Sequence, residues 1–150
     1  MNVKHYFLTV FMLVAFSVEV LANNYTNSTP AVQGYDVVSY QTSKRPIKGS
    51  GHYVYDYQGA TYQFANEANL AVFKKDPMKY VPAYGGYCAY GVSVGKKFVG
   101  DPEVWRIVDG KLYLNLDNSI QAIWLEDVPG RIKISNTEWR KIKDKSPTSL

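Results

Sequence analysis

One thiol and two imidazoles limit the chemistry available to this chain. Cys88 is the only cysteine among 150 residues, and His5 and His52 are the only histidines. Cys88 stands in a glycine-rich segment in which every neighbouring large side chain is a tyrosine. A thiolate is the soft ligand that Cu(I) and similar ions prefer. The sequence therefore predicts a soft-metal site centred on Cys88.

Two other interpretations of Cys88 remain open. It could be a redox thiol that cycles through a sulfenic acid or a mixed disulfide. It could equally be a small, inert core residue, since free cysteine is among the most buried residue types. No base stands beside it in the sequence, so we predict no catalytic residue and expect a binding protein rather than an enzyme.

The other candidate site residues are polar or aromatic. His52 is the candidate second metal ligand, with a solvent-facing strand residue as the alternative. Asp101 is predicted to contact the glycine loop, with an ordinary turn aspartate as the alternative. Tyrosine combines an apolar ring with a polar tip, so the loop tyrosines are predicted to bind a ligand: Tyr84, Tyr87 and Tyr90.

Charge and motif content exclude several classes of partner. The formal net charge is +4, and the basic residues are dispersed along the chain. Neither a basic stripe nor a nucleic-acid-binding module is present, so we expect no nucleic-acid partner. No GxxxxGK[ST] run occurs, which excludes a P-loop. The expected partner is a metal ion or a small ligand.

The N-terminus is typical of an export signal. Residues 1–22 combine Lys4 and His5, an apolar run, and a cleavage pattern that ends at Ala22. Residues 23–30 are polar and are predicted to form a flexible leader. We therefore expect a periplasmic or secreted protein with no stable membrane insertion once the signal is cleaved.

The positioning elements are read from hydrophobic periodicity and turn residues. Residues 35–40 are β-rich, residues 84–95 are predicted to form a loop, and no repeat is detected. Residues 144–150 are predicted to be a flexible tail. Hairpins are expected at 52–64 and 105–116, and helices after Asn66, after Asp117 and up to Lys143. This pattern predicts one α+β domain over residues 31–143.

Four segments together resemble a known family. They are GYDVVSY at 34–40, YQGATYQFA at 57–65, DPMKYVPAYGGYCAYG at 76–91 and DGKLYLNL at 109–116. In combination they resemble the secreted branch of the YHS-domain proteins over residues 31–139. The resemblance implies a small treble-clef-like α+β unit with two hairpins and short helices, usually exported in bacteria. It also implies metal, because YHS domains resemble metal-binding modules and occur beside heavy-metal transport ATPases.

The chain departs from the metal-binding pattern of that family. Ala65 and Asn69 stand where the metal-binding relatives carry cysteines. The inherited metal site is therefore absent, and any metal site must be built around Cys88. The sequence thus predicts an exported small binding protein that handles a copper-like ion through one thiolate. A thiol redox protein and a non-catalytic ligand or protein interaction domain are the alternatives.

Overall fold

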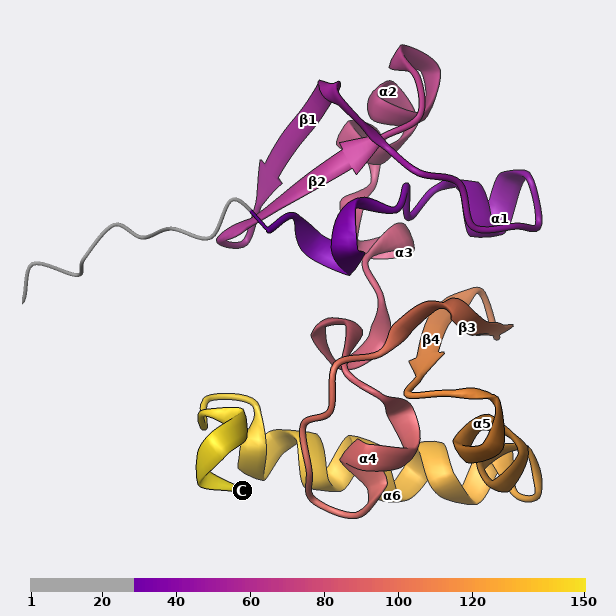
Figure 1. Ribbon diagram of the computed structural model, residues 1–150, viewed down its shortest axis with the longest axis vertical. Helices are drawn as coiled ribbons and strands as arrows, with labels where there is room; N and C mark the ends of the chain where they lie inside the picture. Colours follow the sequence, from indigo (N-terminus) through magenta and orange to yellow (C-terminus); the bar gives the residue numbers. More distant parts are fainter. Residues whose placement is uncertain (1–28) are drawn as a thin grey trace, which may run out of the picture.

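Two tight turns organise the strands of this protein. In the computed structural model, which describes residues 29–150, Gln58-Gly59 and Asp109-Gly110 all have positive φ. Such turns match the twist of a hairpin. Accordingly, β1 (Ser50–Tyr57) pairs antiparallel with β2 (Ala60–Phe64), and β3 (Asp101–Val108) with β4 (Lys111–Asn115) (Figure 1). The predicted α+β fold with two hairpins is confirmed. The signal predicted over 1–22, and most of the leader, lie outside the described residues.

Side-chain caps begin the helices that follow each hairpin. Asn66 accepts a hydrogen bond from the Asn69 N–H, and Asp117 accepts one from the Ile120 N–H, both at 2.9 Å. The helices are α1 (Ser39–Thr42), α2 (Glu67–Lys75), α3 (Pro77–Tyr80), α4 (Ala89–Ser93), α5 (Asn118–Leu125) and α6 (Val128–Ile142). Short 3₁₀ turns are η1 (Ala31–Gly34), η2 (Ala83–Gly86) and η3 (Pro147–Ser149). Among residues 29–150, no helix is long and apolar enough to cross a membrane.

Two local predictions were wrong. The β-rich segment 35–40 makes one isolated bridge, at Tyr35, and then turns into α1. The predicted loop 84–95 contains α4, because Cys88 caps a helix there. Residues 144–150 contain η3, and Leu150 packs against the core of the second half; the flexibility of this tail stays a prediction.

The structure consists of two halves with the same order of elements, and the sequence carries a short trace of this repeat, PAVQGY at 30–35 and PAYGGY at 82–87. We call residues 31–80 the first half and residues 83–142 the second half. Each runs from a 3₁₀ turn through a short helix, a hairpin with a bulge in its first strand, and a capped helix. Asp76 and Asp127 then share nearly the same backbone angles, φ −151° and ψ 75° against φ −150° and ψ 72°. The prediction that no repeat exists is therefore corrected.

The two halves lie one above the other in Figure 1 and share an apolar contact. Phe73 is central to the core of the first half, and Trp124 holds the equivalent position in the second. Tyr40 joins them: its hydroxyl donates to the Pro102 carbonyl at 2.9 Å, and its ring meets Trp105 edge-on at 5.2 Å between centroids. Because Tyr40 is fully buried, the halves form one folded domain.

Candidate functional site

Each half opens with a run of left-handed backbone. In η1, Val32, Gln33 and Gly34 have φ of 51°, 52° and 79°; in η2, Tyr84, Gly85 and Gly86 have φ of 54°, 63° and 84°. Glycine adopts such angles freely, but a β-branched residue such as Val32 does so only under strain. Strain of this kind clusters at ligand-binding sites, which directs attention to the space between the turns.

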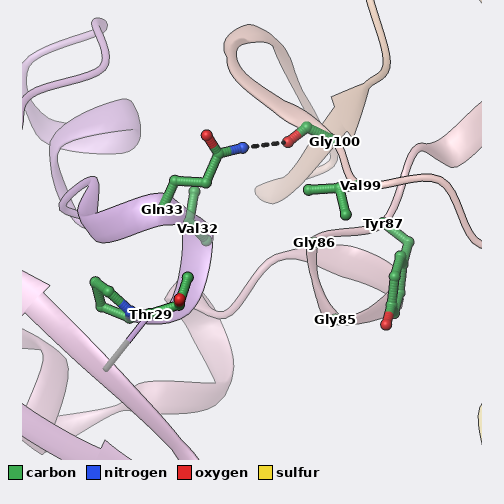
Figure 2. Close-up of a pocket in the computed structure, with 9 residues that line it drawn as sticks. Thr29, Val32, Gln33, Gly85, Gly86, Tyr87, Val99 and Gly100 are labelled. Atoms are coloured by element: carbon green, nitrogen blue, oxygen red, sulfur yellow. Dashed lines mark hydrogen bonds between the residues drawn. The ribbon is translucent and has the colours of Figure 1, made fainter. Parts of the chain in front are cut away.

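A cavity of about 200 Å³ lies between these two turns. Figure 2 shows Gln33 reaching across from the first half, and its side-chain N–H donates to the Gly100 carbonyl at 3.1 Å. The cavity wall is mostly apolar and comes from both halves: Thr29, Pro30, Val32 and Gln33 from the N-terminal side, and Gly85, Gly86, Tyr87, Val99 and Gly100 from the second half. We call this cavity the inter-half pocket.

Tyr87 forms one edge of the inter-half pocket and is held from behind by Lys97. The Lys97 ammonium lies 5.3 Å from the centre of the Tyr87 ring and 5.4 Å from the Trp139 ring. It also donates to the carbonyls of Lys143 and Lys145, both at 2.6 Å. Lys97 therefore fixes the aromatic pair and the C-terminal end of α6 together. Of the three predicted loop tyrosines, Tyr87 is the one that lines the pocket.

Tyr84 and Tyr90 lie elsewhere. Tyr84 is buried in the core of the second half, where its hydroxyl donates to the Asn136 side-chain oxygen at 2.9 Å. Burial raises the pKa of Tyr84 to about 12. The Tyr90 ring lies under the Arg131 guanidinium, 4.8 Å from its centre. A ligand role for these two rings stays a prediction.

Cys88 is fully buried at the start of α4. Its sulfur accepts the Gly91 N–H at 3.3 Å and donates to the Asn115 side-chain oxygen at 3.7 Å. The same Asn115 oxygen accepts the Tyr90 N–H at 3.3 Å. The Asn115 side-chain nitrogen, also buried, has no hydrogen-bond partner among the described residues. This packing suits a small structural residue, but it leaves one donor unused.

In a comparison with known protein families, residues 38–84 match the YHS domain. This segment of the chain is similar to a YHS domain. No curated protein and no solved structure matches the chain. The match runs from the start of α1 to η2 and so covers most of the first half, whereas the resemblance seen in the sequence extended to residue 139. Cys88 lies in the second half, just beyond the matched YHS residues.

The match to the YHS domain raises the question of whether this chain binds a metal ion. The side chains that are available as metal ligands answer it. His52 is exposed on β1 of the first half, while Cys88 is buried in the second. Within residues 29–150 no group of three or more His, Cys, Asp or Glu side chains could hold a metal ion. Cu(I) prefers soft donors, whereas the side chain that meets the Cys88 sulfur is the oxygen of Asn115. The described residues of one chain therefore do not fit a soft-metal site.

Asp101 stands at the start of β3, where its side chain accepts the Glu103 N–H at 2.8 Å. That bond is a turn contact, and a ligand role for Asp101 stays a prediction. Sequence reasoning missed Gln33 and Lys97, which shape the inter-half pocket, and Asn115, which contacts the Cys88 sulfur. Lys97 was counted among the dispersed basic residues, and no local pattern distinguishes a buried lysine from an exposed one.

Proposed function

We propose that this protein is a non-catalytic binding protein that takes a small, largely apolar ligand in the inter-half pocket. The observation that carries the proposal is the pocket itself, which is walled by two left-handed turns and edged by the Tyr87 ring. Of the alternatives that the sequence leaves open, this is the ligand-binding domain, with Tyr87 as its principal side chain.

The size and lining of the pocket define the class of ligand. Drug-sized ligands occupy roughly 300–1,000 Å³, so a cavity of about 200 Å³ suits a smaller molecule. The apolar wall favours a ring or a short aliphatic chain. The Gln33 side chain at its rim carries a carbonyl oxygen that can accept a hydrogen bond from a ligand hydroxyl or amine.

A thermal-shift panel tests this proposal. Phenol, indole, cyclohexanol and acetamide are titrated against the purified chain, because a ligand that binds only the folded state raises the unfolding temperature. We expect at least one ring compound to stabilise the wild-type protein and to have no effect on Tyr87→Leu. Tyr35→Leu is the matched control, since Tyr35 holds the equivalent position in the first half and does not line the pocket. Equal stabilisation of both variants would contradict the proposal.

Soft-metal binding through Cys88 is the second candidate, supported by the Gly91 N–H that already points at the sulfur. It requires a further soft donor from another molecule. Cu(I) is titrated against a competing chelator while alkylation of Cys88 is followed by intact mass. One tight equivalent that shields the thiol, and that is lost in Cys88→Ser, would favour the metal; unchanged alkylation would exclude it.

We further propose that the protein acts outside the cytoplasm, in the periplasm or as a secreted protein. The support is the sequence pattern of residues 1–22, with its basic start, apolar run and small residue at position 22. An oxidising location is compatible with the free cysteine, because Cys88 is buried where the bulky thiol of another protein cannot reach its sulfur to form a mixed disulfide.

A further inference from the structure

Cys88 and Asp36 hold equivalent positions in the two halves. Each follows the tyrosine that ends a left-handed turn, and each is fully buried. The Asp36 N–H donates to the Ile47 carbonyl at 2.8 Å, and the Cys88 N–H donates to the Phe98 carbonyl at 2.8 Å. The backbone that presents a carboxylate in the first half thus presents a thiol in the second.

The first half shows how this backbone arrangement, which we call the frame, binds the carboxylate of Asp36. One Asp36 carboxylate oxygen accepts the Val38 N–H at 2.9 Å. The other accepts the Ala65 N–H at 2.9 Å and the Asn69 side-chain N–H at 2.6 Å. No lysine or arginine donates to this carboxylate among the described residues, so three neutral N–H groups hold a buried carboxyl group there.

The second half keeps only part of that arrangement, because Ile120 stands where Asn69 stands in the first half and supplies no side-chain donor. The N–H two residues after Cys88, that of Tyr90, matches the Val38 donor and is taken by the Asn115 oxygen. The Gly91 N–H points at the sulfur. The Asn115 amide, which is fully buried and contacts the sulfur, leaves its nitrogen unpaired. An unpaired buried donor costs free energy and calls for an acceptor.

We propose that Cys88 is an oxidation site, and that its sulfinate takes the place which the carboxylate of Asp36 holds in the first half. A sulfinate carries two oxygens and one negative charge on the atom attached to Cβ, as aspartate does. Its oxygens would accept the unpaired Asn115 N–H and the Gly91 N–H. This modification is independent of the inter-half pocket, which Cys88 does not line.

The oxidant is hydrogen peroxide or another small hydroperoxide. The sulfur attacks one peroxide oxygen, an S–O bond forms and the O–O bond breaks, and hydroxide leaves with the thiol proton as water to give the sulfenic acid. A second peroxide reacts in the same way, giving a second S–O bond and a second water. Each step oxidises sulfur by two electrons and reduces one peroxide to water, and the resulting sulfinic acid releases its proton to solvent.

Peroxide treatment of the purified full chain tests the proposal, followed by intact mass and peptide fragmentation. Met78, which is 57% exposed, serves as the internal reference for general oxidation. We expect Cys88 to gain two oxygens and stop, and the product to unfold about 4 °C higher than the untreated chain, as one net hydrogen bond would give. Complete oxidation of Met78 with an unmodified Cys88 thiol, or a product that unfolds at a lower temperature, would overturn it.

Three variants separate the sulfinate from other effects. Cys88→Asp places a carboxylate in the frame and should fold, with an unfolding temperature at pH 7 at or above that of Cys88→Ser. Peroxide-treated Cys88→Ser measures the effect of methionine oxidation alone. Asn115→Leu removes the unpaired amide and should abolish the rise in unfolding temperature on oxidation. A folded Cys88→Ser beside an unfolded Cys88→Asp, or an undiminished rise in Asn115→Leu, would refute the assignment.

Discussion

Lys97 is the residue whose removal should destabilise the pocket most clearly. Only 8% of it is exposed, and its ammonium bonds two carbonyls at the end of α6 at 2.6 Å each. Hydrogen bonds to a charged group contribute about 1.5–3 kcal/mol each, and a cation–π contact contributes about 0.5–1 kcal/mol. Water can replace the ammonium at these carbonyls, since Lys143 and Lys145 are exposed. We therefore expect Lys97→Met to cost roughly 3 kcal/mol.

Urea and thermal unfolding measure that loss. At about 4 °C per kcal/mol for a domain of this size, the unfolding temperature should fall by about 12 °C. Lys48→Met is the matched control, because the exposed Lys48 ammonium also lies over a tyrosine, 4.0 Å from the Tyr35 ring, but bonds one carbonyl weakly at 3.4 Å. Its cost should stay below about 1 kcal/mol. Equal losses in the two variants would refute the role given to Lys97.

Three further predictions concern other parts of the chain. Burial raises the pKa of Tyr84 from 10.0 to about 12, so the unfolded chain loses this proton first as pH rises. The free energy of unfolding should therefore fall by about 3 kcal/mol between about pH 10 and 12. In Tyr84→Phe, urea unfolding measured against pH should no longer show this contribution to the loss. Asp36→Ala leaves three N–H donors without an acceptor and should lower the free energy of unfolding, measured with urea, by about 3 kcal/mol or more. A loss below about 1 kcal/mol would contradict the stabilising role given to the Asp36 hydrogen bonds. Exported protein should begin at Asn23 by intact mass, and a retained Met1 would contradict the cleavage site.

Local sequence patterns predicted the parts of the fold that local physics determines. Gln58-Gly59 and Asp109-Gly110 specify their turns because these residues tolerate positive φ, and Asn66 and Asp117 begin helices because their side chains accept backbone N–H groups. The hairpin predicted over 52–64 has an alternating pattern, and its tyrosines at 53, 55 and 57 all pack on the core of the first half.

The duplication and the pocket could not be predicted in this way. The halves share the pattern PAxxGY, which reads PAVQGY at 30–35 and PAYGGY at 82–87, but their other identical residues are scattered, so the repeat is clearer in backbone geometry than in residue type. Val32 carries no local indication of its positive φ, which the surrounding packing imposes. The pocket depends on residues far apart along the chain, such as Gln33 and Gly100, and their meeting follows only from the packing of the two halves.

Mapping the site of binding on the ¹⁵N-labelled chain tests the central claim most directly. A ring compound such as phenol or indole is titrated while the backbone amide resonances are followed. The inter-half pocket predicts saturable shifts at Gly85, Gly86 and Gly100, with the same compound leaving these amides unmoved in Tyr87→Leu. Shifts confined to the groove beside α2 and α3, near Val72 and Lys79, or no saturable shift, would contradict it.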